Sequence, residues 1–388
     1  ANLPAGTAGA IVGFKDYRNT FDTNALTISP NGSDKIGGST DDVVLGTEGL
    51  AISLVFIDST RGWLVTDSGL QSEATAPQFV TATGGTISTT PCGNFKVHTF
   101  TGPGTFCVSN AGNPVGSDKV DYLVVGAGGS GGAANGAFGA GAGGAGGFRV
   151  SNTTCMPVPQ TSPLVAPNTP EPAAIPVSAT GFPITVGAGG ASAPSLNSNG
   201  NNGNASSFST ISSAGGGYGG GGSSPGNSAG ASGGSGGGAW GCNGCASGGA
   251  GNTPPVSPPQ GNNGGARTPG SNGGSGGGGA GAVGANVGPP SVGGAGGVGS
   301  FVVQTGFAGC NGTPGPVSGA RYFAGGGGGA SPPTGGDGGA GGGGKGGDGG
   351  TDPGCAGTAN SGGGGGGTRA GTSGAGGSGI VIIRYKFQ

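Results

Sequence analysis

Residues 122–132 read YLVVGAGGSGG, a short apolar run that passes directly into a glycine tract. The run Tyr122–Val125 is rich in β-branched and aromatic residues, which is typical of a strand. The glycines that follow cannot form an α-helix, because each glycine there costs about 1 kcal/mol relative to alanine. The same pairing of an apolar run with glycine tracts recurs at Phe148–Val150, Phe182–Val186, Ser207–Ile211, Phe301–Val303 and Ile380–Tyr385.

The composition changes along the chain. Of its 388 residues 107 are glycine, and residues 1–120 hold only 17 of these but 16 of the 28 charged residues. The formal net charge of −2 is too small for a typical disordered chain. Sparse Lys and Arg argue against nucleic-acid binding, and no apolar run reaches the roughly 18 residues of a membrane span. We therefore expect neither nucleic acid nor membrane insertion.

The glycine tracts have two conformations open to them. One is a flexible coil, and the other is the extended threefold helix related to polyproline II, in which neighbouring helices bond to each other. We expect packed polyglycine-II helices, because the interleaved strands bring the ends of each glycine loop together. Alanine, serine and asparagine would then take the outward positions.

The sequence predicts a mainly β fold with essentially no α-helix. Residues 1–75 form a small β module, in which the strand at Ala51–Ile57 is followed by a turn at Asp58–Gly62 and a returning strand. Residues 76–120 form a short β-hairpin connector. Residues 121–388 form the glycine-rich domain, with a proline-rich insertion at 157–183 that we expect to be polyproline II-like.

No motif in the sequence predicts an enzyme or a cofactor site. Residues Gly126–Gly131 match GxGxxG, but no helix follows and the next acidic residue is Glu171, too distant for dinucleotide binding. The single histidine, His98, lies in a strand-like stretch and is predicted to face solvent. The aspartates Asp337 and Asp348 lack the spacing of calcium repeats, so no metal site is predicted.

Seven cysteines leave at least one unpaired within the chain. Cys92 and Cys107 flank a hairpin-like stretch, and Cys310 and Cys355 bracket a glycine segment, so either pair could form a disulfide. Another two cysteines form a CxxC without the context of a redox or zinc site, and a local disulfide or separate cross-links are expected there, at Cys242 and Cys245.

Aromatic residues within the glycine-rich part have two interpretations. They fill gaps between glycine helices and the strands, or they form a platform at loop tips that contacts a sugar or a receptor. Trp240 is the first candidate for such contact, and the full set is Trp240, Tyr218, Phe138, Phe307, Tyr322 and Phe323.

Several segments together resemble the glycine-rich domain of bacteriophage tail-fibre and adhesin proteins. These are Tyr122–Gly129, Gly144–Arg149, Ile184–Gly190, Ser206–Phe208 and the ending Gly376–Tyr385, so the resemblance covers about residues 80–388. The N-terminal stretch, with Phe21–Ile28 and Gly62–Trp63, is similar to small β modules of trimeric fibres and appendages. The proline-rich insertion and the cysteines depart from that pattern.

The resemblance implies an extracellular virion protein, a tail fibre whose glycine-rich domain attaches to a host-surface glycan or outer-membrane protein. The N-terminal module would join other tail or appendage proteins and form a homo-oligomer, a trimer. The alternative is a purely structural virion component, such as a head fibre, decoration protein or filament subunit. An ice-binding or cell-wall protein would need regular flat Thr or Ala faces, which the sequence does not show.

Overall fold

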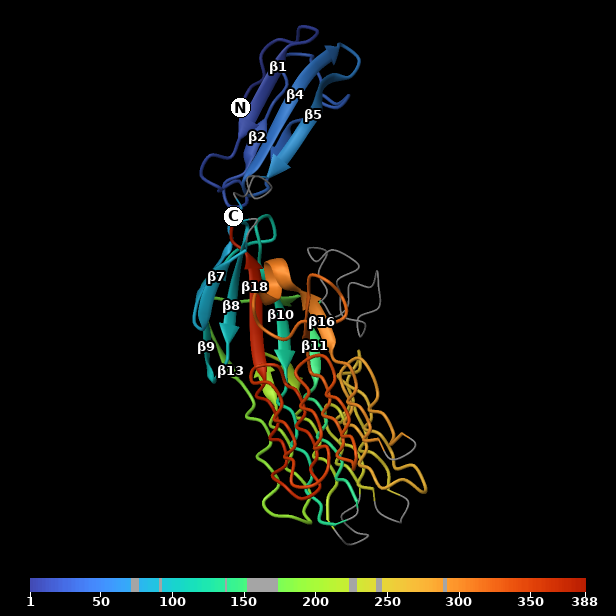
Figure 1. The fold of residues 1–388 in the computed structure, drawn as a ribbon. Coiled ribbons are helices and arrows are strands. Elements are labelled where there is room, and N and C mark those ends of the chain that lie inside the picture. The colour runs from blue at the N-terminus through green and yellow to red at the C-terminus, as the bar shows by residue number, and fades with distance from the viewer. Residues whose placement is uncertain are drawn as a thin grey trace. The chain divides into compact units, whose positions relative to one another are not determined.

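The chain folds into two compact units, Ala1–Pro77 and Gln78–Gln388. The computed structural model describes residues 1–70, 77–90, 93–136, 138–151, 174–222, 229–241, 246–288 and 292–388. Its regular elements are antiparallel strands (Figure 1), and its helical residues form one irregular turn, η3 (Gln304–Ala308). The predicted mainly β fold is therefore confirmed. The predicted boundary at residue 75 lies outside the described residues.

The first unit is a β module with its own core. β4 (Leu50–Asp58) lies between β1 (Ile11–Lys15) and β5 (Gly62–Leu70), while β2 (Leu26–Ile28) pairs with β3 (Val43–Leu45). Side chains alternate along β4 with the period of two that a strand imposes. The buried core is made of Leu3, Ile28, Ile36, Leu45, Ile52, Leu54, Phe56 and Trp63.

The predicted turn between β4 and β5 is present. Asp58 Oδ1 accepts two backbone N–H groups within the turn, at 2.8 and 2.7 Å. Gly62 closes it with a φ of 71°, where a Cβ atom would lie 1.9 Å from the carbonyl oxygen of Lys35. The next side chain, Trp63, is fully buried and packs edge-on against Phe56 with ring centroids 5.5 Å apart.

A buried carboxylate organises the loop after β1. Asp16 accepts hydrogen bonds from the backbone N–H groups of Thr20, Phe21 and Gly49 at 2.9–3.0 Å. Burial by itself would raise the pKa of Asp16, but these hydrogen bonds stabilise the ionised form and hold the pKa below its ordinary value.

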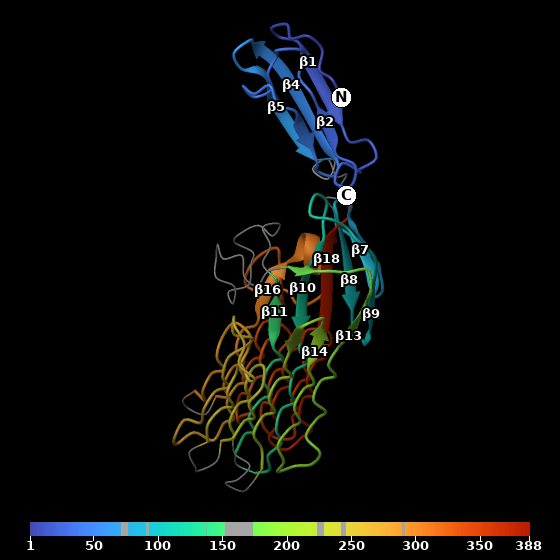
Figure 2. The same cartoon turned by 180° about the vertical axis from the view of Figure 1, so that it is seen from behind.

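Most strands of the second unit form two sheets that share a core, and two further strands form a separate hairpin. The larger sheet has the order β11-β10-β18-β8-β7, with β12 paired to β10, and the smaller has the order β15-β14-β13-β9-β6 (Figures 1 and 2). The strands are β6 (Val80–Thr83), β7 (Thr86–Thr89), β8 (Phe95–Phe100), β9 (Gly104–Ala111), β10 (Lys119–Val125), β11 (Phe148–Val150), β12 (Ile175–Pro176), β13 (Gly181–Thr185), β14 (Ser206–Phe208), β15 (Ile211–Ser213) and β18 (Ile380–Lys386).

Residues 78–120, most of the segment expected to be a hairpin connector, belong to the second unit. They supply β6 and β9 to the smaller sheet and β7 and β8 to the larger one. β8 pairs with the C-terminal strand β18, and β9 pairs with β13. Because these partners lie far along the chain, the local hairpin pattern could not show them.

Both faces of the larger sheet are buried at its central strands β10 and β18, whereas the edge strand β7 is exposed. Between the two sheets lies a core that includes Phe106, Phe208 and Tyr385. The opposite face packs against η3 and the hairpin of β16 (Ser300–Val303) and β17 (Ala320–Phe323). Coverage on both faces explains why β10 and β18 carry the apolar runs Tyr122–Val125 and Ile380–Ile383 without polar alternation.

His98 lies in the core, which contradicts the prediction that it faces solvent. Its Nδ1 is 2.7 Å from the Gly84 carbonyl oxygen, and its Nε2 is 3.1 Å from the hydroxyl of Tyr385. That hydroxyl accepts the N–H of Ala82 at 3.2 Å. Burial lowers the pKa of His98 and raises that of Tyr385, so both are neutral in the folded protein.

A buried ion pair joins β10 to β18. Arg384 Nη2 donates to Asp121 Oδ2 at 2.6 Å, and both side chains are less than a tenth exposed. Ser151 donates its hydroxyl to the other Asp121 oxygen. The guanidinium also lies over the rings of Phe95 and Phe307, at 4.8 and 5.1 Å, so its charge is partnered on several sides.

The glycine segments form threefold helices. Along residues 126–133 the N–H groups bond to three other tracts in rotation, at 2.8–3.0 Å, so residues three apart face the same neighbour. A three-residue repeat bonded only to neighbours is polyglycine-II geometry, as predicted. The donor–acceptor pairs are Gly126–Gly147, Gly129–Gly144 and Gly132–Gly141, then Ala127–Asn204, Ser130–Asn201 and Ala133–Ser198, then Gly128–Gly377 and Gly131–Gly374.

The hydrogen bonds between these helices define a hexagonal lattice, which continues from one end of the strands (Figure 1). The tract 139–147, here called the central tract, is bonded to six others that form a closed ring: 126–134, 214–222, 235–241, 272–280, 324–331 and 362–368. Around the ring lies an outer shell of tracts at 187–193, 198–204, 230–234, 246–251, 261–267, 284–288, 292–299, 334–340, 343–347, 353–358 and 372–379.

The lattice requires glycine at many of its inner contacts. The central tract nevertheless contains the fully buried Ala140, Ala142 and Ala145, so the expectation that alanine takes only outward positions is wrong. A Cβ atom on Gly143 of the central tract would lie 2.0 Å from the carbonyl oxygen of Gly129, and one on Gly327 would lie 2.2 Å from that of Gly365. Outer tracts instead carry a side chain at every third residue, on the face turned to solvent. The tract 292–299 shows this with its exposed Val292, Ala295 and Val298.

The proline-rich insertion is only partly described. Residues 152–173 lie outside the described residues, whereas Ile175–Pro176 and Gly181–Thr185 pair as β12 and β13. The end of the insertion is therefore strand rather than polyproline II, because its backbone pairs with β10 and β9.

Candidate functional site

Three of the aromatic residues predicted as contact candidates are core residues. Phe307 and Phe323 are 2% and 0% exposed and pack on the outer face of the larger sheet. Tyr322 is 4% exposed and packs against the ring of Phe301, 5.0 Å away. The prediction of an exposed platform is wrong for these residues, because they form the covering layer of β17 and η3.

Trp240 and Phe138 fill a gap between glycine tracts. Trp240 is 4% exposed, and its ring lies edge-on to that of half-buried Phe138, with centroids 5.9 Å apart. Ala134 and Ala140 complete this small cluster. Here the structure favours the gap-filling interpretation of the sequence over the platform interpretation. Tyr218 is the remaining candidate, and it lies half-buried at the surface of the lattice.

Tyr218 belongs to the tract 214–222, here called the edge tract. Each helix of the lattice donates in three directions and accepts from three others. The edge tract donates to 126–134 and 235–241, and it accepts from 139–147, 198–204 and 230–234. The remaining direction is that of the Tyr218 and Gly221 N–H groups, and no glycine tract of the described chain occupies it. We call this side of the lattice the open edge.

Two asparagines take the place of the absent helix. Asn202 Oδ1 accepts the N–H of Tyr218 at 2.9 Å, and Asn199 Oδ1 accepts the N–H of Gly221 at 2.9 Å. Both belong to the tract 198–204, here called the asparagine tract. Since Asn199 and Asn202 are three residues apart, about 9 Å along a threefold helix, they occupy equivalent positions along the open edge. Sequence reasoning missed both residues, although the repeat NGNN at 199–202 was a visible signal.

The open edge is uncharged. Residues 172–266, which include the edge tract and the asparagine tract, contain no Asp, Glu, Lys or Arg. The surface groups on offer are therefore amides, hydroxyls and an aromatic ring. Such groups fit a neutral partner with hydrogen-bonding groups of its own, whereas an anionic or cationic partner would find no counter-charge.

Several charged groups of the lattice lie at or next to its chain reversals, whereas Asp337 and Lys345 belong to outer tracts. The tract 126–134 leaves β10 and the central tract returns to β11, so the reversals of this kind lie at the end away from the strands (Figure 1). There Asp348 pairs with Lys345 at 2.7 Å, and Arg369 donates to the carbonyl oxygen of Gly136. Asp348 also accepts the N–H of Gly335. Nowhere in the described chain do three His, Cys, Asp or Glu side chains cluster for a metal.

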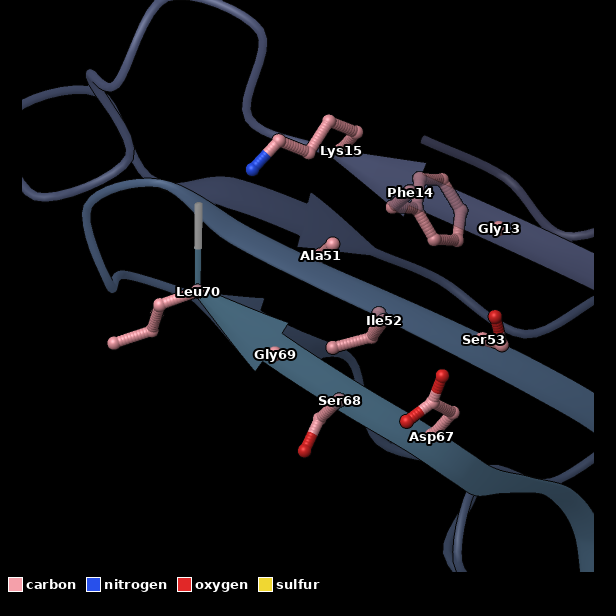
Figure 3. A pocket seen from close by; sticks show the side chains of 10 residues that line it. All are labelled: Gly13, Phe14, Lys15, Ala51, Ile52, Ser53, Asp67, Ser68, Gly69 and Leu70. Atoms are coloured by element: carbon pink, nitrogen blue, oxygen red, sulfur yellow. The ribbon is translucent and has the colours of Figure 1, made fainter. Parts of the chain in front are cut away.

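A shallow cleft of about 530 Å³ lies over the sheet of the first unit (Figure 3). Its charged lining residues are Lys15 on β1 and Asp67 on β5. Lys15 Nζ is engaged by the carbonyl oxygen of Gly49 at 2.6 Å. The other side chains of the lining with polar groups are those of Ser53 and Ser68, whose hydroxyls lie near Asp67 (Figure 3). The full lining is Gly13, Phe14, Lys15, Ala51, Ile52, Ser53, Asp67, Ser68, Gly69 and Leu70.

The described cysteines carry free thiols. Cys107, Cys310 and Cys355 are exposed and unpaired, so the predicted Cys310–Cys355 disulfide is not formed, and Cys107 has no bridge to Cys92. Cys310 follows η3 on the strand side, whereas the backbone of Cys355 is bonded into the outer shell of the lattice, which keeps the two apart. Cys92, Cys242 and Cys245 lie outside the described residues.

The GxGxxG match is part of the lattice. The N–H groups of Gly128 and Gly129 are bonded to the carbonyl oxygens of Gly377 and Gly144, so they are not available to a phosphate. No helix in the described part of the chain is long and apolar enough to span a membrane.

The chain matches the model of a known protein family. The model of a family described as a glycine-rich domain matches residues 100–386, which cover most of the second unit. No curated protein matches the chain.

Proposed function

We propose, on the premise that this chain belongs to the glycine-rich domain family, that it is the adhesin of a bacteriophage tail fibre. It acts at the virion surface, outside the cell, and binds a glycan or an outer-membrane protein of the host without catalysing a reaction. The observation that carries this proposal is the open edge, an uncharged row of asparagine amides and Tyr218 on a rigid lattice.

The rest of the lattice suits such a role. Its inner glycines are fixed by backbone hydrogen bonds to several neighbours, so the surface side chains are held on a stiff support. Its reversals connect tracts whose register the lattice already sets, so they can vary without disturbing it. Preorganised side chains lose little freedom on binding, which favours affinity.

The first unit is proposed to attach the protein to the particle as a homo-oligomer, a trimer, in contact with other tail proteins. Its sheet leaves large apolar side chains exposed: Ile11 is 70%, Val65 55% and Ile57 45% exposed. Exposed apolar patches commonly mark protein–protein contacts.

A purely structural virion role is the second candidate. The observation in its favour is that Trp240, Phe307, Tyr322 and Phe323 are buried, so most of the aromatic contact candidates are packing residues. Such a protein would be a head fibre, decoration protein or filament subunit.

The test is the binding of the fluorescently labelled full-length protein to intact bacteria. An adhesin is expected to bind host cells saturably, to be displaced by unlabelled protein, and to show no binding to non-host cells. If the protein assembles with particle proteins but does not bind cells that the particle infects, the structural role is supported and the adhesin role is rejected.

A further inference from the structure

The capping hydrogen bonds fix how Asn199 and Asn202 face the solvent. Each carboxamide oxygen is held by a backbone N–H group, from Gly221 and Tyr218 respectively. The Nδ2 group of each side chain, a donor of two hydrogens, is therefore on the side away from that bond. No described residue accepts a hydrogen bond from either Nδ2. The open edge thus presents neutral donors in a fixed orientation.

These donors repeat beside an aromatic ring. Asn199 and Asn202 are separated by one period of the threefold helix, about 9 Å, and Tyr218 lies beside them on the edge tract. A tyrosine ring offers an apolar face and a hydroxyl that both donates and accepts. The partner that this surface fits is extended, periodic, uncharged and rich in oxygen acceptors.

An extended glycine-rich peptide is a poorer fit to the same place. As one more lattice helix, it would need the N–H groups of Tyr218 and Gly221 for its own carbonyl oxygens. Both are already taken by the asparagine side chains. A peptide would have to displace the caps, whereas a hydroxyl-rich chain can bind to their outer side.

We propose that the open edge binds a neutral surface polysaccharide, with the Asn199 and Asn202 amides donating to its oxygens and the Tyr218 ring lying against its sugar faces. This rests on the proposed attachment function and names the ligand class and the residues that contact it.

The variants separate binding from packing. Asn202→Asp keeps the oxygen that caps the Tyr218 N–H but removes the outward donor, and Tyr218→Ala removes the ring. Each is expected to weaken binding about tenfold, the loss of one good polar or aromatic contact. The matched control is Asn286→Asp, because Asn286 caps the Ala266 N–H at 2.8 Å in the same way, between two other outer tracts. It should bind as the unchanged protein does.

The assay is binding of the full-length protein and its variants to the cells that it recognises. The cells are treated with periodate, which cleaves sugar diols, or with protease, and polysaccharide extracted from them serves as soluble competitor. Loss of binding after periodate, survival after protease and inhibition by the extract are expected. Binding should also be insensitive to salt, since no charge is involved.

Two results would overturn the inference while leaving the attachment function in place. One is binding that protease abolishes and periodate spares, which would indicate a protein receptor. The other is unchanged binding by Asn202→Asp and Tyr218→Ala, which would move the contact elsewhere on the chain. Absence of binding to any host cell would instead remove the attachment function itself.

Discussion

Replacing Gly143 by alanine is expected to destabilise the second unit by about 3 kcal/mol, the upper end for an overpacked core. The added Cβ atom would lie 2.0 Å from the carbonyl oxygen of Gly129 and 2.5 Å from its carbon. Relief requires a shift of about 1 Å, since a methyl group needs over 3 Å from such an oxygen. The atoms in the way are backbone, and the central tract is enclosed by six others, so no side chain can rotate aside.

The measurement is calorimetric melting of the full-length protein. A loss of about 3 kcal/mol lowers the melting temperature of a unit of this size by about 5 °C. The control is Gly102→Ala, in the β8–β9 turn, where a Cβ atom would meet nothing within 4 Å. It should melt within about 1 °C of the unchanged protein. Equal melting of both variants would refute the close-packed lattice, because a loose glycine coil would accept either alanine.

Three further predictions concern buried polar groups. Because the pKa of Asp16 is lowered in the folded state, its ionised carboxylate stabilises the first unit at pH values above its ordinary pKa, and this stabilisation is lost as the pH falls through the folded-state pKa. Replacement Asp16→Asn should therefore make the melting temperature of the first unit depend less on pH below about pH 4. Because burial lowers the pKa of His98 from 6.5, the unfolded chain takes up the proton first, so second-unit stability is full above about pH 6.5 and falls below it. His98→Gln should remove that slope from the melting temperature, and an unchanged slope would contradict the assignment. Asp121→Ala leaves Arg384 buried without its carboxylate partner and should lower the free energy of unfolding, measured with denaturant, by about 3–5 kcal/mol. Replacing Asp121 by leucine and Arg384 by methionine together should recover most of that free energy. Equal losses in the two variants would argue against the ion pair.

The candidate site was only partly predictable from the sequence. Tyr218 and Trp240 both stand between glycine runs, and nothing local separates them, yet Trp240 is 4% exposed and Tyr218 lies at the open edge. The difference arises from lattice position, since Trp240 contacts Phe138 from another reversal. The roles of Asn199 and Asn202 likewise depend on which helix lies beside theirs.

Local residue preferences were sufficient to predict whether each segment is a strand or an extended glycine helix. Glycine tracts cannot be α-helical, and β-branched runs such as Ile380–Tyr385 favour strands, so the sequence alone determined an all-β chain with extended glycine helices. Only the tertiary structure showed which strands and which glycine tracts lie next to one another. β18 pairs with β8 and β10, which both lie more than 250 residues earlier, and the central tract is enclosed by tracts from across the second unit. The physical reason is that glycine tracts carry no side chains to mark their partners. Backbone hydrogen bonds are alike for every tract, so the strands and the few outward side chains select the arrangement.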